Sequence, residues 1–343
     1  MRTYLLPASG QFYKANLHCH TVLSDGHKTP EEIKEIYKNA GYAVVAYTDH
    51  DILIPHPELC DDSFIALNAF EVEPTEPKTP GKELYALRKT CHICCIALEQ
   101  DNITQPCWHR TKYLFGNAVE HRDKVRFDES QPDYERRYSG EGISEMMQIY
   151  RENGFFVTYN HPTWSSEQYT EYTNYHGMNA FEMYNGSCIV GGWDEYNSRV
   201  YDDILRGGER IFCIGADDNH NGRPLDSRRC DSFVAFTMIK AEHLTYRDVT
   251  RALEAGHFYA SEGPQINALY YEDGKVTIEC SPADRIFLTT DMRAARIAFD
   301  EGDAPLTGAT FTVPENCRYF RLTVVDKSGK HANTNAYFTD TLH

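Results

Sequence analysis

The chain has 343 residues, of which 41% are hydrophobic, and its 34 Lys+Arg against 51 Asp+Glu give a formal net charge of -17. This length suits one large domain, or a large domain with a smaller one. So acidic a chain is not expected to present a broad nucleic-acid-binding surface or a surface for anionic membranes. A small anionic substrate is not excluded, because bound metal ions can reverse the field locally.

The sequence has 11 cysteines, an odd number scattered through strand-like segments. Unpaired thiols are typical of a reducing compartment, so we expect a cytoplasmic protein. The N-terminal stretch MRTYLLPASGQFYKA is too polar to be a signal peptide. No run approaches the ~18 apolar residues of a membrane span, so no membrane partner is expected.

The first elements in chain order are a strand, a loop and a helix. The helix is predicted over residues 29–41, TPEEIKEIYKNAG. Thr29 is the expected N-cap, Glu32 completes a capping box with it, and Gly41 ends the helix.

Strand and helix patterns then continue to alternate. The predicted strands are residues 42–51, 64–74, 90–98, 155–162, 178–186 and 210–220, and the predicted helices are residues 143–154 and 193–208. This alternation indicates βα units and a mostly parallel sheet or barrel. Residues 99–140 interrupt it with polar, aromatic and charged sequence, which indicates an inserted segment and a candidate lid.

From about residue 265 the pattern changes to short strands separated by turn residues. Residues 266–281, INALYYEDGKVTIECS, predict a hairpin with Asp273 and Gly274 at its turn. We therefore expect two domains, residues 1–263 and residues 264–343, the second a small all-β sandwich. We expect the sandwich to pack on the first domain and to supply no metal ligand, whether it serves subunit contact or shapes the rim of the site.

Histidine and acidic residues gather where the predicted strands end. In a parallel βα array these ends lie on one face, where active sites form. His92 begins its strand instead, but it joins the same face if that strand runs antiparallel to the strand of Glu71. The residues at the other strand ends are His18, His20, Asp49, His50, Asp51, Glu71, Glu73, His161, Asp217, Asp218 and His220.

A single HxH pair such as His18 and His20 is more often incidental than metal-binding. Each of the other side chains could likewise cap a strand or bond a backbone group. Capping or backbone bonding does not explain why imidazole or carboxylate groups occur at five strand ends together. Imidazole and carboxylate suit Zn²⁺, Mn²⁺ or Fe²⁺, and one carboxylate can bridge two ions.

These segments resemble the PHP family, the polymerase and histidinol phosphatase domain of metal-dependent phosphoesterases. The resemblance covers about residues 14–263, and its joint HxH, SDG, TDHD and DxH motifs are highly specific. It implies a distorted seven-stranded βα barrel that holds up to three metal ions. In chain order it rests on NLHCHTVLSDG, PEEIKEIYKNAGYAVVAYTDHD, FEVEP, NHP, FEMYNG, DNH and AGHFYASEGP.

The resemblance implies two to three divalent ions, Zn, Mn or Fe, held by nine residues. Asp218 is preferred over Asp217 because it has the DxH spacing to His220. Glu71 would bridge two of the ions. The implied ligands are His18, His20, Glu71 and Asp218 for one ion, Glu71, His92 and His161 for a second, and Asp25, His50 and His220 for a third.

The activity that the resemblance implies is hydrolysis of a small phosphate mono- or diester through a metal-bridging hydroxide. Glu71, Asp218 and His220 would be catalytic, and the substrate a small phosphorylated molecule such as a nucleotide or sugar phosphate. An amidohydrolase-type metal hydrolase is the first alternative, which the TDHD and DxH motifs and Glu71 disfavour. A non-catalytic metal-binding PHP module is the second, which the complete ligand set disfavours. The oligomeric state stays open.

Cys91 and Cys94 form a CxxC motif that can suggest a zinc ribbon. No second CxxC follows, and residues three apart on a strand point to opposite faces. We therefore expect buried strand cysteines.

Other polar residues near the motifs have structural explanations that are at least as good as functional ones. His109 and His121 in the inserted segment are expected at the surface, and Glu182 and Asn185 either line the site or support the fold. The arginines after His220 either reach a substrate phosphate or pair with surface carboxylates: Arg223, Arg228 and Arg229.

Overall fold

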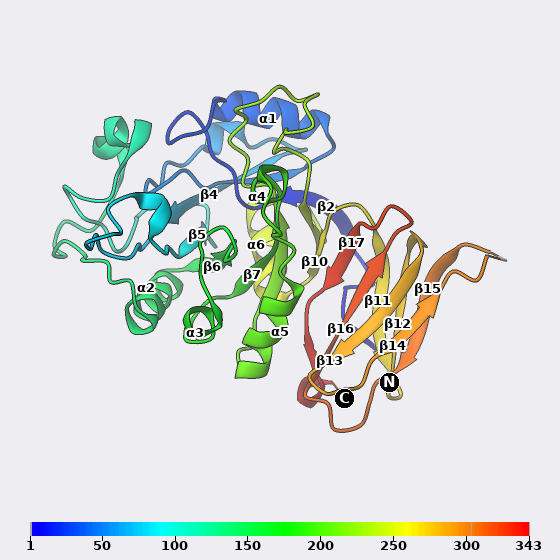
Figure 1. Ribbon diagram of the computed structural model, residues 1–343. Helices are drawn as coiled ribbons and strands as arrows, with labels where there is room; N and C mark the ends of the chain where they lie inside the picture. Colours follow the sequence, from blue (N-terminus) through cyan, green and yellow to red (C-terminus); the bar gives the residue numbers. More distant parts are fainter. Residues whose placement is uncertain (1, 303, 343) are drawn as a thin grey trace.

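The structure, a computed structural model, describes residues 2–302 and 304–342. A barrel built from about the first three quarters of the chain lies beside a β-sandwich formed mostly by the last quarter (Figure 1). Within the described residues, no helix is both long and apolar enough to cross a membrane.

Seven strands form the barrel: β2 (Gln11–Asn16), β3 (Val44–Tyr47), β4 (Ile65–Val72), β5 (His92–Ala97), β6 (Phe155–Asn160), β7 (Ala180–Asn185) and β8 (Phe212–Ala216). Neighbours pair in this order, parallel except where β5 runs antiparallel to β4 and β6. The ends of β2 and β8 meet where the His20 N–H donates to the Asn219 carbonyl at 3.0 Å and the Asp218 N–H donates to the His18 carbonyl at 2.9 Å. The predicted distorted seven-stranded barrel is therefore confirmed.

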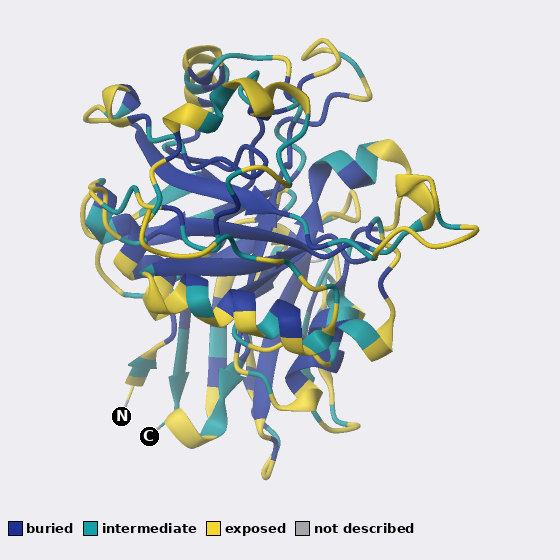
Figure 2. Ribbon diagram, turned by 90° about the vertical axis from the view of Figure 1, so that its left-hand side faces the viewer, coloured by how far each residue is buried: buried dark blue, intermediate teal, exposed yellow. Residues whose placement is uncertain are grey.

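Barrel strands β3 to β7 are buried on both faces, and the helices around the barrel carry exposed residues on their outer sides (Figure 2). The helices are α1 (Pro30–Asn39), α2 (Gly140–Glu152), α3 (Tyr169–Tyr172), α4 (Gly186–Gly191), α5 (Ser198–Gly207) and α6 (Tyr246–Ala255), with short 3₁₀ turns η1 (Pro57–Leu59), η2 (Tyr85–Leu87), η3 (Gly116–Lys124) and η4 (Thr339–Thr341). The predicted cap of α1 is present, because Thr29 accepts from the Glu32 N–H and the Glu32 carboxylate accepts from the Thr29 N–H.

The sandwich consists of two antiparallel sheets around an apolar core that includes Leu269, Ile278, Ile286 and Leu322. One sheet contains β1 (Arg2–Tyr4), β11 (Ile266–Glu272), β12 (Lys275–Ala283) and β15 (Leu306–Thr312). The other contains β14 (Arg296–Phe299), β13 (Arg285–Thr290), β16 (Tyr319–Val325) and β17 (His331–Thr334), with β18 (Tyr337–Phe338) beside β16. The predicted hairpin turn falls at Asp273 and Gly274, between β11 and β12.

Two strand pairings cross the expected boundary near residue 263. β1 comes from the N-terminus yet pairs with β11 of the sandwich. β17 of the sandwich pairs with β10 (Phe258–Ser261), which pairs with β9 (Phe236–Ala241) beside β2. The division into residues 1–263 and 264–343 stays a prediction, and the sheet itself is continuous across it.

The inserted segment, residues 99–140, is mostly irregular and packs on the barrel through a small core of its own, in which Trp108 and Val125 contact Ile52. His109 is buried there, accepts two backbone N–H groups and bonds Glu135 at 3.2 Å. The expectation of a surface position for His109 was wrong, because its ring organises the segment. His121 is half-buried.

Candidate metal centre

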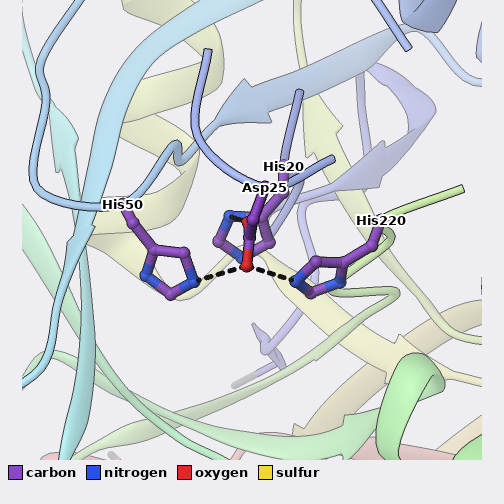
Figure 3. Close-up of side chains that lie close together, drawn as sticks. All are labelled: His20, Asp25, His50 and His220. Carbon is purple, nitrogen blue, oxygen red and sulfur yellow. Dashed lines mark ion pairs between the residues drawn. The ribbon is translucent and has the colours of Figure 1, made fainter. Parts of the chain in front are cut away.

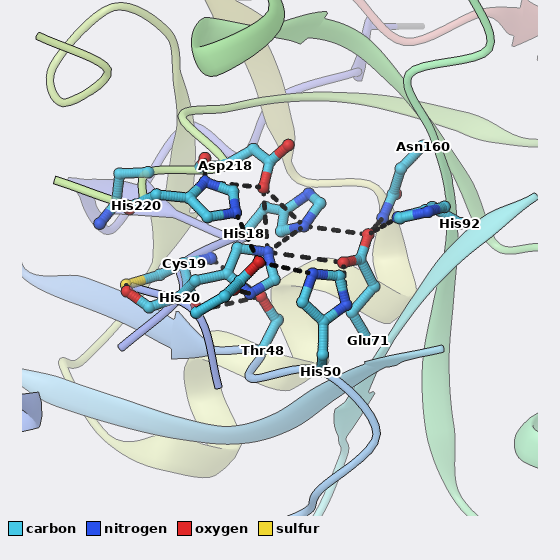
Figure 4. A network of polar contacts seen from close by, with 12 residues as sticks. His18, Cys19, His20, Thr48, His50, Glu71, His92, Asn160, Asp218 and His220 are labelled. Carbon is cyan, nitrogen blue, oxygen red and sulfur yellow. Dashed lines mark hydrogen bonds and ion pairs between the residues drawn. The ribbon is translucent and has the colours of Figure 1, made fainter. Parts of the chain in front are cut away.

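The strand ends, together with the turn that carries Asp25, bring all nine predicted ligands together on one face of the barrel. Figure 4 shows the part of this cluster around Glu71. His92 joins them because β5 runs antiparallel to β4, which sets the start of β5 beside the end of β4. Asp218 faces this cluster. Asp217 points away and accepts three backbone N–H groups and the Tyr37 hydroxyl.

The carboxylate of Glu71 lies at the centre and is only 1% exposed. Both of its oxygens face imidazole nitrogens, as expected of a group that joins two cation positions. Oε1 lies 3.1 Å from His18 Nε2, 3.1 Å from His92 Nδ1 and 3.5 Å from His161 Nε2, and Oε2 lies 3.2 Å from His50 Nδ1 and 3.4 Å from His20 Nε2.

A second carboxylate, Asp25, faces three further imidazole contacts at the outer edge of the cluster (Figure 3). The distances from its oxygens are 3.7 Å to His20 Nδ1, 3.6 Å to His50 Nε2 and 3.5 Å to His220 Nε2. Asp25 itself is about one third exposed, so this part of the centre faces solvent.

The turn that presents Asp25 is held by Asp49 of the TDHD motif. The Asp49 carboxylate accepts from the Thr21 N–H and hydroxyl, both at 2.8 Å, and from the Ser24 hydroxyl at 2.7 Å. Gly26 completes the turn because a Cβ there would lie 2.5 Å from the His20 carbonyl oxygen. The SDG sequence is therefore explained by close backbone approach as well as by its aspartate.

The side chains of β7 orient two of the histidines. Glu182 is fully buried, and its Oε1 lies 3.0 Å from His18 Nδ1 while its Oε2 accepts from the His161 N–H at 3.2 Å. Asn185 donates to Glu182 at 2.9 Å and to Asp218 Oδ2 at 3.0 Å. Both residues therefore contact candidate ligands.

Three residues in or beside the centre adopt positive φ angles, 62° at Asp51, 27° at His161 and 52° at Asp218. Non-glycine residues rarely adopt this region, and such conformations persist where the surrounding structure holds them at functional sites. The backbone is thus bent at three of the strand ends that supply ligands.

The charges of the centre favour cations. Burial raises the pKa of a carboxyl group, yet the charges of His18 and the other imidazoles hold the pKa of both Glu71 and Asp218 below the usual range. Asp25, Glu73 and Glu182 lie nearby. Among the described residues, these carboxylates form ion pairs with histidines and with no Lys or Arg.

The buried polar atoms also fit metal ions. Within the described part of the chain, four such atoms of the centre lack a hydrogen-bond partner: His20 Nδ1, His50 Nδ1, Glu71 Oε2 and His161 Nε2. An unsatisfied buried group costs about 1–3 kcal/mol, which a bound cation would offset. Imidazole and carboxylate donors suit Zn²⁺, Mn²⁺ or Fe²⁺.

The candidate ligand atoms form overlapping groups in which all atoms lie within 4.8 Å of one another. These groups differ in part from the predicted division among three ions, because His20 joins the third and His50 joins Glu71 and His92. The groups are His20, Asp25, His50 and His220; His18, Glu71 and His161; His18, His20 and Asp218; and His50, Glu71 and His92. They are consistent with a multinuclear metal site, and the assignment of each ligand to an ion stays a prediction.

A pocket of about 780 Å³ opens above the centre. Its walls carry aromatic side chains and two arginines: Tyr85, Tyr113, Phe115, Trp164, Trp193, Arg88 and Arg136. The arginines that follow His220 (Arg223, Arg228 and Arg229) are exposed and lie outside this wall.

The predicted ligand set leaves out several charged and polar residues of the pocket. Glu73 contacts His92 Nε2 at 3.2 Å, and the Tyr85 hydroxyl donates to Glu73 at 3.0 Å. Arg136 reaches the pocket from the inserted segment and forms an ion pair with Asp51. Glu73 had a signal, its place at a strand end, whereas Tyr85 and Arg136 lie in irregular segments without a periodic pattern.

Cys91, just before β5, and Cys94, within it, face different surroundings, as expected of residues three apart on an extended chain. Cys91 packs in the apolar core, whereas Cys94 accepts from the Asn160 amide at 3.0 Å beside the centre. All 11 cysteines are free of disulfides. Among the described residues, none of them belongs to a group of three or more candidate metal ligands, so the CxxC motif does not form a zinc ribbon in this fold.

No protein-family model matches the chain, and no curated protein matches it. Among solved structures, the chain is similar to a two-domain protein from Bacteroides vulgatus ATCC 8482 that contains a predicted PHP-like metal-dependent phosphoesterase, with 15% identity and a TM-score of 0.45 over 98% of this chain and 90% of that one. It is also similar to a protein from Bifidobacterium adolescentis ATCC 15703 provisionally described as a metal-dependent phosphoesterase, with 16% identity and a TM-score of 0.36 over 64% of this chain and 91% of that one. An amidohydrolase from Chromobacterium violaceum, with bound sulfate and no metal, aligns at 14% identity and a TM-score of 0.34 over 71% of this chain and 96% of that one. The geometry of the centre itself carries the chemistry proposed below.

Proposed function

We propose that the protein is a metal-dependent phosphoesterase that hydrolyses a small phosphate mono- or diester. The observation that carries this proposal is the buried carboxylate of Glu71, whose two oxygens face five imidazoles from four other strand ends or starts. Such a group can hold two divalent ions at a fixed separation. Bound ions would supply a water nucleophile active near neutral pH and neutralise charge on phosphoryl oxygens.

The residues of the chain prepare the centre for that chemistry. Glu182 holds the His18 ring through Nδ1, which leaves Nε2 directed at Glu71 and Asp218. Asn185 bonds one oxygen of Asp218, so that the other faces His18 and His20. Oriented, hydrogen-bonded ligands of this kind are typical of working metal sites. Glu71, Asp218 and His220 remain the residues proposed to be catalytic.

The pocket suits a small ester with an anionic group. The ring of Phe115 packs on His50 with centroids 4.8 Å apart, and Trp164 packs on His92 at 5.1 Å, so apolar walls flank the centre. Arg88 and Arg136 face the same pocket, and within the described chain the Nε atom of each lacks a hydrogen-bond partner. A volume of about 780 Å³ accommodates a nucleotide or a sugar phosphate.

The test is a metal-reconstitution screen. Protein stripped with a chelator and reloaded with Zn²⁺, Mn²⁺ or Fe²⁺ is assayed for phosphate release from nucleotide and sugar monophosphates and for cleavage of a p-nitrophenyl phosphodiester. We expect metal-dependent turnover of at least one class. Metal-loaded protein that cleaves amides or lactones and no phosphate ester would overturn the proposal in favour of an amidohydrolase, and bound metal without any turnover would favour a binding module.

A further inference from the structure

Three stacked rings join the sandwich to the barrel. The Tyr196 ring lies against Tyr184 of β7 with centroids 4.9 Å apart and planes at 5°, and against His331 of β17 at 4.4 Å and 24°. Tyr196 therefore sits between a barrel strand and a sandwich strand.

The sandwich side of this stack is firmly held. The Glu262 carboxylate bonds both the backbone N–H of His331 and its Nδ1 atom, each at 3.2 Å. Asn333, two residues along β17, donates to the Tyr184 hydroxyl. The Tyr196 ring is thus connected to β17 by its contact with the His331 ring and by the hydrogen bond from Asn333 to Tyr184.

The residue before Tyr196 reaches the turn that follows His161. Glu195 is fully buried, and its carboxylate accepts from the Thr163 N–H at 3.1 Å and from the Trp164 N–H at 3.0 Å. Asn197 reinforces this contact by donating to Glu195 at 2.6 Å. Glu195 therefore fixes the backbone from which the Trp164 side chain projects.

Trp164 is the point at which this chain of contacts reaches the pocket. Its ring packs against His92 at 5.1 Å and His161 at 5.2 Å and lines the pocket wall. Trp193, two residues before Glu195, lines the same wall. The loop of residues 193–197 thus contributes one pocket residue directly and holds another through the backbone.

We propose that Glu195 and Tyr196 are positioning residues, and that the sandwich sets the pocket wall through the contact of His331 with Tyr196. Glu195 and Tyr196 act on Trp164 and touch no candidate ligand directly. The effect on substrate binding rests on the proposed phosphoesterase function, whereas the effect on Trp164 does not.

A structural test uses the three tryptophans of the chain. Protein labelled with 5-fluorotryptophan gives one ¹⁹F resonance per residue, each assigned with a single Trp→Phe variant. His331→Ala is expected to shift the resonances of Trp164 and Trp193 and to leave that of Trp108, in the core of the inserted segment, in place. His331→Phe keeps a flat ring on Tyr196 and is expected to restore the wild-type positions.

Phe299→Ala is the matched control, since it removes an exposed ring from strand β14 at the far edge of the same sheet. It is expected to leave all three resonances unchanged. The inference is overturned if the Trp164 resonance ignores His331→Ala, if Phe299→Ala moves it equally, or if His331→Phe fails to restore it.

A kinetic test applies to the metal-loaded protein and its best phosphate ester. His331→Ala is expected to raise KM about 3- to 10-fold, the factor that corresponds to the loss of one aromatic contact, with little change in kcat. Metal content is expected to stay at the wild-type value, and His331→Phe to restore KM. An unchanged KM for His331→Ala overturns the inference. Metal-loaded wild-type protein that cleaves neither phosphate monoesters nor diesters would refute the proposed function and leave the ¹⁹F measurement to decide the inference.

Discussion

At the scale of single residues, Glu71 faces five imidazoles, more than any other carboxylate of the centre among the described residues. Among the described residues, the carboxylate of Glu73, two residues on, contacts His92 and the Tyr85 hydroxyl and no second imidazole. The two glutamates lie on the same strand end, so sequence spacing alone cannot rank them. Their contacts make Glu71, and not Glu73, the candidate for a ligand that bridges two ions.

Glu71→Gln is expected to lower kcat and kcat/KM together by about 100-fold or more, the scale seen when one electrostatic stabiliser is removed. The neutral amide loses the charge that would hold two ions, so metal content should also fall. Steady-state kinetics with element analysis measures both.

Glu73→Gln should cost less, because it loses contact with a single imidazole. Glu167→Gln, a change at a buried glutamate outside the centre, should keep the metal. Equal losses at Glu71 and Glu73 would contradict the central role of Glu71.

Glu182→Gln is expected to weaken metal affinity about 10- to 100-fold, the usual effect of losing a group that orients a metal-binding histidine. Its carboxylate holds His18 Nδ1 at 3.0 Å, and an amide would orient that ring less strongly. Competition with a chelating dye measures the affinity. Glu209→Gln is the control, because Glu209 bonds His176 at 2.7 Å on the surface. Unchanged affinity in Glu182→Gln would show that His18 needs no such support.

At the scale of elements, a buried carboxylate ties strand β6 to the segments that surround the pocket. Glu167 accepts from the Tyr159 hydroxyl of β6 at 2.6 Å, from Tyr138 at the end of the inserted segment at 3.0 Å, and from Tyr175. Burial raises the pKa of Glu167 to about 7, and the three hydroxyl donors only partly oppose this effect.

This raised pKa predicts a pH-dependent stability. The folded state binds the proton more tightly than the unfolded chain, whose glutamate titrates near 4.5. The contribution of Glu167 is therefore complete below about pH 4.5 and is lost as the pH rises through about 7. The loss is expected to reach about 3 kcal/mol.

Urea denaturation of the wild type and of Glu167→Gln at pH 5 and pH 8 tests this expectation. The stability difference between the two proteins should shift in favour of Glu167→Gln at pH 8, while titrations elsewhere cancel in the comparison. A difference that is the same at both pH values would show that Glu167 does not titrate in this range.

At the scale of the whole molecule, the centre gathers buried carboxylates and imidazoles from strands that span about 200 residues. Without cations, Asp25, Glu71 and Asp218 repel one another in a site where burial weakens solvent screening. Metal binding and folding stability are therefore expected to be coupled.

Removal of the metals is expected to lower the melting temperature, and reloading to restore it. At a free metal concentration about 1,000-fold above Kd, the stabilisation should be about 4 kcal/mol. Differential scanning calorimetry with and without a chelator measures the change, and Glu71→Gln should show a smaller one. Identical melting curves for stripped and loaded protein would contradict the coupling.

The alternation of strands and helices, the cap of α1 and the hairpin at Asp273 could be predicted from the residue pattern alone. These features depend on local periodicity and on capping chemistry, whereas the seven-stranded barrel and the nine candidate ligands were implied by the resemblance of the motifs to the PHP family. The choice of Asp218 over Asp217 also followed from spacing, and the structure places Asp218 in the cluster.

Only the tertiary structure decided which residues surround these ligands. Glu182, Glu195 and Arg136 act through partners that are distant in the chain, and no local pattern encodes such contacts. The same holds for β1, whose three residues join the sandwich because β11 offers an unpaired edge. His109 was misplaced for the same reason, since its burial depends on how the inserted segment folds back on itself. Periodicity predicts which elements form, whereas the pairing of distant segments depends on the packing of the whole molecule.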